Sequence, residues 1–378
     1  MVKRKLVLGF LCFCYLIFIS SCWDSRDIED LTIAIAAGYD TAKQSGSHYD
    51  DKENKVAVTG VFPLFEEEVV SSATVATNEA KTIAATRVKR AYKTPRKLLL
   101  GMLQAAVYGD ELARKGLYGS IEILLRDPQV KHDVLVALAY DRAEDVLKTK
   151  INNYSNVGNY VFDLLKNSRT NAFIPKVTIH AFAMGALSDC KNPVLPIIKP
   201  GINSIEIVGL GIFRGDRLIA RASTDEARII SFLRGEEMEG YLPFVIEKEG
   251  KIFNEGSVYV KNSRKVEVYR KGNIYNFNIT VKLKGDVVEQ SSQRPLSEKG
   301  EELKEIEKSV AKDIKMQCES MITKIKTEYK VDCIDISRFA MAKWRKELKK
   351  IINDEDFIRQ ANINVDVDVV ILRKGEMQ

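Results

Sequence analysis

The chain has few residues of the types that most often carry out chemistry. Its 378 residues include only three histidines and six cysteines, so a metal centre or a histidine-based catalytic site has few candidates. His48, His132 and His180 are scattered and show no ligand spacing. The H-E-x-x-H, G-x-S-x-G, Walker A and paired C-x-x-C motifs are all missing from the sequence. We therefore predict that the protein is not an enzyme, and that it has no catalytic residues, no metal site and no cofactor.

The composition excludes several classes of protein. Hydrophobic residues make up 45% and charged residues 29% of the chain, which is typical of a globular protein. Disorder over most of the length, a collagen-like chain, a coiled-coil rod and a multi-span membrane protein are thereby excluded. The 58 basic and 52 acidic residues give a net charge of +6, an excess too small to indicate nucleic-acid binding. At about 150 residues per domain, the length predicts two or three domains.

Residues 1–22 have the pattern of an export signal. Three basic residues at positions 3–5 precede fourteen mostly apolar residues, which are too few to span a bilayer comfortably. The apolar run ends in Ile19-Ser20-Ser21-Cys22, which resembles the lipobox of bacterial lipoproteins. We predict a signal peptide at 1–21 and diacylglyceryl modification of Cys22, a stable anchor because each buried CH₂ contributes about 0.8 kcal/mol. The alternatives are a secreted protein with an incidental Cys22 and an uncleaved N-terminal anchor.

Removal of this signal lowers the net charge from +6 to +3, because it takes away three basic residues and no acid. Apart from the lipidated cysteine, the mature chain keeps Cys190, Cys318 and Cys333. Three thiols permit at most one disulfide, so the protein is not a disulfide scaffold. Cys318 is predicted to be a small buried hydrophobic residue, and its distance in sequence from Cys333 leaves a bridge between them open.

The first half of the mature chain alternates segments typical of strands and of helices. The predicted strands are residues 32–40, 56–62, 97–108 and 134–140. The predicted helices are residues 78–93, with Ala80, Ala84, Val88 and Ala91 along one face, 110–126, N-capped by Asp110, and 143–148. An exposed loop is expected at residues 41–55. This alternation favours a layer of helices packed against a sheet.

Three of the nine prolines lie between residues 190 and 204, which is our main predicted domain boundary. It divides the mature chain into residues 22–198 and residues 201–378, with a further division near residue 290 as an alternative. Beyond the boundary, Arg214-Gly215-Asp216 predicts a hairpin, and Thr224 or Asp225 is the expected cap of a helix ending near Arg234. Several strand-like runs follow between residues 251 and 288.

The most regular pattern is an apolar stripe over residues 297–329. The spacing of its members by three or four residues predicts one helix of about thirty residues. They are Leu303, Ile306, Val310, Ile314, Cys318, Met321, Ile325 and Tyr329. A second helix is predicted at 337–350, and alternating apolar and polar residues at 363–371 predict a half-buried final strand. The sequence thus predicts a multidomain α+β fold, with mixed sheets packed with helices and a long helix near the C-terminus.

Seven basic residues and no acid lie between residues 81 and 97. They are Lys81, Arg87, Lys89, Arg90, Lys93, Arg96 and Lys97. A lipid-tethered protein could place such a face against anionic headgroups or an acidic partner, although a solvated helix face is the simpler interpretation. We take Arg87, Lys89 and Arg90 as candidate partner or membrane contacts, together with three residues next to the predicted anchor. These three are Trp23, Asp24 and Arg26.

Several segments, in the same order and at similar spacing, resemble one family, the C subunits of spore germinant receptors. The segments are Cys22-Trp23-Asp24 with Arg26, Ile28, Glu29 and Leu31, then Gly38-Tyr39-Asp40, residues 109–116 (GDELARKG), 124–128 (LLRDP), 192–196 (NPVLP) and 209–213 (GLGIF). The resemblance covers essentially the whole mature chain. Residue 37 departs from it, because it is alanine where the family often has a branched apolar residue.

The resemblance implies a non-enzymatic, lipid-anchored subunit on the outer face of the membrane that becomes the inner membrane of a dormant spore. It implies assembly with two integral-membrane subunits, one transporter-like and one with large soluble domains, in a complex that senses nutrients and triggers germination. It also implies a mixed α/β fold of several domains. Without the resemblance, the best class is a lipid-anchored solute-binding protein of an importer. That class predicts two similar lobes around a cleft, which the long helix and residues 251–288 fit poorly.

Overall fold

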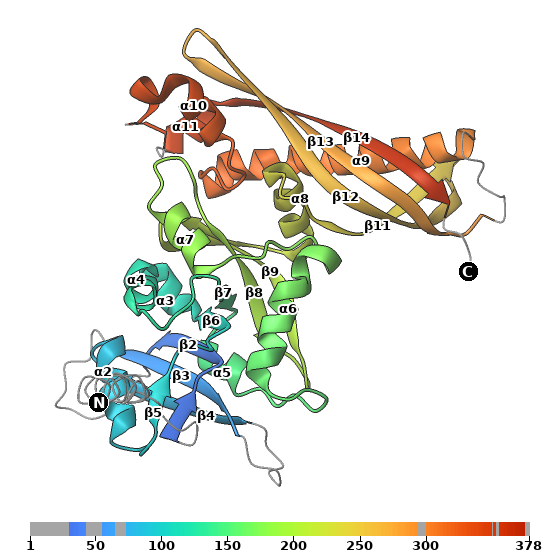
Figure 1. Cartoon of the computed structure of the whole chain (residues 1–378). Coiled ribbons are helices and arrows are strands. Elements are labelled where there is room, and N and C mark those ends of the chain that lie inside the picture. The colour runs from blue at the N-terminus through green and yellow to red at the C-terminus, as the bar shows by residue number, and fades with distance from the viewer. Residues whose placement is uncertain are drawn as a thin grey trace, which may run out of the picture.

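The computed structural model describes residues 30–42, 55–64, 73–292, 300–349, 351–352 and 355–374. These residues form two layered parts that meet around α8 (Thr224–Arg234), as Figure 1 shows. The first part is a sheet of eight strands between helices, and the second is a sheet of four strands with a long helix along one face. The predicted α+β architecture, with mixed sheets and a long helix near the C-terminus, is confirmed.

Four parallel strands form the centre of the larger sheet. They are β2 (Ala36–Thr41), β6 (Ala105–Tyr108), β7 (Leu135–Ala139) and β8 (Val194–Pro200). Every residue of β6 and β7 is buried, as expected for apolar strands with helices on both faces. Antiparallel hairpins extend the sheet on both sides. These are β3 (Val56–Pro63) with β4 (Ala73–Ala80), and β9 (Ile205–Arg214) with β10 (Arg217–Ala222).

Helices cover both faces of this sheet. On one face, α3 (Asp110–Lys115), α4 (Tyr118–Arg126) and α7 (Ile179–Ala186) enclose a core that contains Tyr108 and Phe213. On the other face, α5 (Ala143–Leu147) and α6 (Val157–Asn171) pack over Val107. Neighbouring residues of one strand therefore belong to different cores, because strand side chains alternate between the two faces.

Two predicted elements of this region divide in the structure. The apolar run 97–108 forms two strands, β6 and the short β5 (Lys97–Leu99), which pairs in parallel with β1 (Leu31–Ile33). The helix predicted at 110–126 breaks into α3 and α4 at Gly116, whose φ of 122° is accessible mainly to glycine. Asp110 is the first residue of α3 and not its cap, since Gly109 occupies the cap position.

The helix predicted at 78–93 is the shorter α2 (Ile83–Ala91), because residues 78–80 belong to β4. Its N-cap is Thr82, whose hydroxyl accepts a hydrogen bond from the Ala85 amide at 3.1 Å. The predicted apolar face of the helix is turned outward. Ala84, Val88 and Ala91 are exposed, whereas Ile83, Thr86 and Arg90 are buried. The position of α2 over β3 and β4 thus overrides its sequence pattern.

The smaller sheet has the strand order β11-β12-β13-β14. Its strands are β11 (Glu239–Lys248), β12 (Lys251–Lys271), β13 (Ile274–Gln290) and β14 (Asn362–Lys374). The strand-like runs predicted between 251 and 288 are therefore two long antiparallel strands, joined by a turn in which Gly272 has a φ of 62°. The final strand pairs in parallel with β13, because the helices between them return the chain to the same end of the sheet.

The predicted apolar stripe near the C-terminus is buried along its whole length. It lies on α9 (Glu301–Lys324) and on the π-helical turn η3 (Ile325–Tyr329) that continues it, and α9 runs along one face of the sheet (Figure 1). The two other elements predicted here are also confirmed, as α10 (Ser337–Leu348) and the half-buried β14. A short helix, α11 (Glu355–Gln360), precedes β14.

The hairpin predicted at Arg214-Gly215-Asp216 is the β9–β10 connection, in which Gly215 has a φ of 58°. The following helix α8 is capped by Ser223, and not by Thr224 or Asp225 as predicted, and Glu226 completes a capping box. The predicted boundary at residues 198–201 lies at the end of β8. The sheet continues beyond it through β9 and β10, and the division into residues 22–198 and 201–378 stays a prediction.

Cys190, Cys318 and Cys333 are all free thiols, so the bridge that the sequence leaves open is not formed. Cys318 and Cys333 are buried in the same hydrophobic core. Burial raises the pKa of the Cys318 thiol to about 12 and that of the Cys333 thiol well above its usual range. Both side chains are therefore neutral, and Cys318 is the small buried hydrophobic residue that its place in the stripe predicts.

Candidate functional site

A cleft of about 800 Å³ opens beside the outer hairpin of the larger sheet. It lies between β3, β4, α2 and the turn 92–96, and Phe62 and Ala76 contribute apolar surface to it. Leu31 also lines the cleft and pairs with Lys97 in the ladder between β1 and β5. The chain that leads back to the predicted lipidation site therefore enters the fold next to the basic segment 81–97.

The described lining of this cleft carries charge of only one sign. Arg90, Lys93 and Arg96 contribute three cations, and no aspartate or glutamate is among the described residues that line it. The hydroxyl-bearing lining residues are Thr32, Thr74, Thr77 and Thr94, of which Thr77 already donates its hydroxyl to Glu144 at 3.2 Å. Cations and hydroxyl donors without acids are the groups that attract an anion.

Arg90 is buried although it is charged. Its side chain lies over the ring of Phe62, with the guanidinium carbon 4.9 Å from the ring centroid, and only 8% of the residue is exposed. Its one hydrogen bond to the described part of the chain, to the Arg96 carbonyl, is long at 3.4 Å. Burial lowers the pKa of Arg90, and no described carboxylate forms an ion pair with it. An arginine that is this little exposed and has no described carboxylate partner is uncommon, which distinguishes the cleft from the rest of the surface.

Asn78, at the end of β4, faces the same cleft. It is 8% exposed, and its side-chain oxygen Oδ1 is buried without a hydrogen-bond partner among the described residues. Buried polar atoms are nearly always partnered in folded proteins. Asn78 thus leaves one buried acceptor without a described partner, on the wall of the cleft that Arg90 also lines. The sequence offers no signal for this pairing, since an asparagine and an arginine twelve residues apart form no motif.

The structure separates the three basic residues predicted as contacts. Arg87 forms an ion pair with Asp127 at 2.7 Å, and Arg90 is buried in the cleft. Lys89 is exposed, and it lies beside two exposed residues of apolar character, Val88 at 54% and Tyr92 at 85% exposure. The other predicted contacts fall outside the described residues, as does the predicted lipidation site. They are Cys22, Trp23, Asp24 and Arg26.

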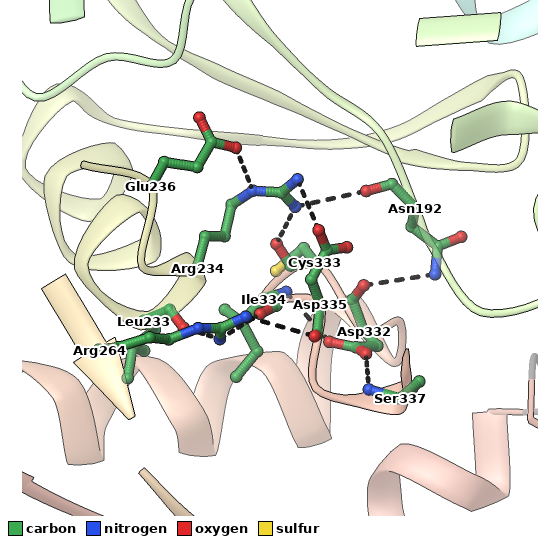
Figure 2. A network of polar contacts seen from close by, with 10 residues as sticks. All are labelled: Asn192, Leu233, Arg234, Glu236, Arg264, Asp332, Cys333, Ile334, Asp335 and Ser337. Carbon is green, nitrogen blue, oxygen red and sulfur yellow. Dashed lines mark hydrogen bonds and ion pairs between the residues drawn. The ribbon is translucent and has the colours of Figure 1, made fainter. Parts of the chain in front are cut away.

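A second polar cluster joins the two parts of the molecule (Figure 2). Arg234, at the end of α8, donates to the Cys333 carbonyl at 2.8 Å and forms an ion pair with Asp335 at 3.1 Å. Asn192 donates through its amide Nδ2 to the Asp332 carbonyl at 3.3 Å. Residues before β8 and after β10 are thereby tied to the loop that precedes α10.

Arg264 of β12 binds the same loop, through a hydrogen bond to the Ile334 carbonyl at 2.7 Å. Burial lowers the pKa of Arg264 to about 10, with Arg338 adding to the effect. Burial also opposes the charged form of Arg234, but Asp335 and Glu236 outweigh it and raise the pKa. The two arginines remain cationic at neutral pH. Their partners are carbonyls and carboxylates of the chain itself, so this cluster is a structural joint.

The segment Gly38-Tyr39-Asp40 owes its place in the fold to packing and capping. The Asp40 carboxylate accepts hydrogen bonds from the amides of Ala143 and Glu144, both at 2.9 Å, at the start of α5. Tyr39 stacks on Tyr108 with ring centroids 5.0 Å apart. These residues hold the parallel strands to the helices that cover them. Their spacing in the sequence does not predict these contacts.

Comparison with known proteins identifies the family. A family model described as the spore germination protein N-terminal domain matches residues 24–200, and one described as spore germination B3/GerAC-like, C-terminal matches residues 208–375. The chain is 19% identical to the spore germination protein GerQC of Bacillus cereus, over 95% of this chain and 96% of that protein. It is 22% identical to spore germination protein B3 of Bacillus subtilis, over 86% of each chain.

Among solved structures, the crystal structure of the GerBC protein has the same fold. The match has a TM-score of 0.53 and 17% sequence identity, and it covers 92% of this chain and all of that one. The two parts of the molecule thus define a spore germination protein of the type matched by both family models. The chain belongs to the family of spore germinant receptor C subunits, as its sequence motifs predict.

The relatives are germination proteins and not known enzymes. In the part of the chain that the structure describes, no three His, Cys, Asp or Glu side chains are grouped so that they could hold a metal ion. None of the helices in that part is both long enough and apolar enough to cross a membrane.

Proposed function

We propose that this protein is a non-enzymatic, lipid-anchored subunit of a nutrient germinant receptor. Cys22 carries the lipid, and the folded chain assembles with two integral-membrane receptor subunits, one transporter-like and one with large soluble domains. The complex transmits the nutrient signal that starts germination. The observation that carries this proposal is the match of two germination family models, one after the other, behind a lipobox-like Cys22.

The fold supports this role over that of a solute-binding protein. An importer's binding protein would have two similar lobes around a ligand cleft. Here the two sheets differ, with eight strands around a parallel centre in one and four mostly antiparallel strands in the other. The arginine cluster of Figure 2 ties the two parts together at their junction through hydrogen bonds.

We further propose that the outer face of α2 is turned toward the membrane or a membrane subunit. Lys89 is exposed there among apolar side chains, and β1 brings the chain from the anchor to the same region. Trp23, Asp24 and Arg26 follow Cys22 directly in sequence, so anchoring places them at the membrane surface. Basic residues beside apolar and tyrosine side chains suit such an interface.

Replacement of Cys22 tests the anchor. In spores that carry the Cys22→Ala chain, we expect the protein to leave the inner-membrane fraction and the membrane subunits to co-purify with it poorly. The matched control is Cys190→Ala, which removes a half-buried free thiol and should change neither readout. Retention of the Cys22→Ala chain in the membrane fraction would contradict lipid anchoring.

The same co-purification tests the α2 face. The charge reversal Lys89→Glu should lower recovery of the membrane subunits while the chain stays in the membrane fraction. Lys304→Glu, at an exposed position of α9, is the matched control. Equal recovery with both variants would count against a contact at α2 and would leave the anchor untouched.

A further inference from the structure

We propose that the cleft between α2 and the β3–β4 hairpin binds a phosphate group, with Arg90 as its central contact. The phosphate could belong to a small phosphorylated metabolite or to a phospholipid headgroup, and the experiment below distinguishes these sources. This inference goes beyond the receptor role, and binding of a soluble ligand does not depend on the anchor. It rests on Asn78 Oδ1, which has no described partner, on Arg90, which has no described carboxylate partner, and on the charge of the described lining.

Arg90 has the chemistry and the geometry of a phosphate contact. A guanidinium presents parallel N–H donors that match two oxygens of a phosphate, and here no described carboxylate competes for them. The ring of Phe62 supports the guanidinium plane from one side. Lys93 and Arg96 line the same cleft and bring its cationic side chains to three. This charge favours a phosphate over a single carboxylate.

Asn78 narrows the ligand class. Its Oδ1 needs a hydrogen-bond donor, which a phosphate without protons does not offer. A ligand with a hydroxyl close to its phosphate would satisfy both Arg90 and Asn78. Such ligands include glycerol phosphates and sugar phosphates, and also the headgroup of phosphatidylglycerol.

The size and position of the cleft suit either source. Its volume of about 800 Å³ lies within the range of small-molecule sites, and Phe62 and Leu31 offer apolar surface to a carbon skeleton. Leu31 lies nine positions after Cys22, so an anchored chain would hold this region within about 32 Å of the membrane surface. A lipid headgroup is therefore within reach as well as a soluble ligand.

The alternative to an external ligand is an internal ion pair between the cationic cleft and acids of the chain itself. Glu66, Glu67 and Glu68 follow β3 in the sequence and lie outside the described residues. Their replacement by glutamine distinguishes an internal ion pair from an external ligand. If they fill the cleft, glycerol 3-phosphate should bind only to the glutamine variant.

The first arm of the test is calorimetric titration of the mature chain with sn-glycerol 3-phosphate, with glycerol as the uncharged control. The second arm measures hydrogen exchange of residues 73–97 in the lipidated chain, in vesicles of phosphatidylcholine with or without phosphatidylglycerol. Saturable binding in the first arm supports a soluble ligand. Slower exchange only with phosphatidylglycerol supports a lipid headgroup.

Substitutions of single residues test whether the phosphate ligand binds in the cleft. Arg90→Gln should weaken the interaction by about tenfold or more, because a charge-assisted hydrogen bond is lost. Arg87→Gln is the matched control on the same helix, since its guanidinium is already paired with Asp127. Asn78→Asp provides a second test if Arg90→Gln folds poorly. It places a negative charge on the cleft wall, so it should raise the melting temperature and abolish binding.

Three results would overturn the proposal. The first is the absence of a saturable response in both arms. The second is equal weakening by Arg87→Gln and Arg90→Gln, which would indicate nonspecific attraction to the basic segment. The third is binding that appears only after replacement of the three glutamates. None of these results bears on membrane retention by Cys22, so this proposal and the proposed anchor fail independently.

Discussion

The two sheets of this protein differ in how they are covered. The strands of the larger sheet have four to ten residues and are packed between helices on both faces. Those of the smaller sheet have 10 to 21 residues and carry α9 on one face only. A sheet covered on both faces needs strands that are apolar throughout, whereas a sheet covered on one face needs only alternation. The long strands of the second sheet can therefore expose their other face to solvent.

Both parts contain buried polar groups, but these groups have different surroundings. In the larger sheet, Asp40 caps a helix from a central strand, and beside the outer hairpin Asn78 Oδ1 has no hydrogen-bond partner among the described residues. In the smaller sheet, a continuous apolar stripe of α9 fills the space over the strands. Buried polar atoms without a described partner thus occur in both parts, for example at Asn78 in the first and at Asn262 and Asp286 in the second. What distinguishes Asn78 is that it lines the cleft beside the outer hairpin.

Among the proposed substitutions, we expect the largest loss in the free energy of unfolding from one in the core of the second part. Ile306 is completely buried on α9, so Ile306→Ala should lower the free energy of unfolding by about 4 kcal/mol through lost burial and a cavity. Met316→Ala, at a half-exposed site of the same helix, should change it by less than about 0.5 kcal/mol. Denaturant unfolding measures both variants. Similar losses from the two would show that the stripe does not carry this core.

A smaller effect is expected at the joint between the parts. Arg234→Ala should cost about 3 kcal/mol, because it leaves buried carbonyls and Asp335 without a partner. It should also separate the unfolding of the two parts into two calorimetric transitions. Arg228→Ala is the control on the same helix, where the ion pair with Asp225 stays within α8. A single unshifted transition in Arg234→Ala would contradict a structural role for the cluster.

The smallest of the three effects is expected in the larger sheet. Asp40→Ala should cost about 2 kcal/mol, since two amides at the start of α5 lose their acceptor. Asp145→Ala removes an exposed acid of the same helix and should be nearly neutral. Thermal unfolding compares the two. If Asp40→Ala is as mild as its control, packing and not capping holds α5 to the sheet.

The regular elements could be predicted because each depends on its own residues. The spacing of eight apolar residues defines the α9 stripe, and alternation defines β14, without reference to the rest of the chain. Elements with a weak local signal were predicted less well. The run 97–108 could not show that it contains two strands, because its division depends on the pairing of β5 with β1.

The candidate site was predicted only in part. The basic segment 81–97 is visible in the sequence, and so is its lack of acids. Which of its residues face solvent depends on how α2 packs on the hairpin. That packing buries Arg90, pairs Arg87 with Asp127 and leaves Lys89 exposed. Asn78 was not predicted as a site residue, since nothing in its sequence context distinguishes it from other strand residues.

Sequence alone determined the family, the absence of common catalytic motifs, the net charge and the regular elements of the C-terminal part, because these depend on composition, order and local periodicity. Tertiary structure decided which strands are neighbours, which face of α2 is buried and which polar side chains line the cleft. These depend on contacts between residues far apart in the chain. The physical reason is that burial and hydrogen bonding are properties of the packed whole, and at Arg90 they override the preference of a charged residue for water.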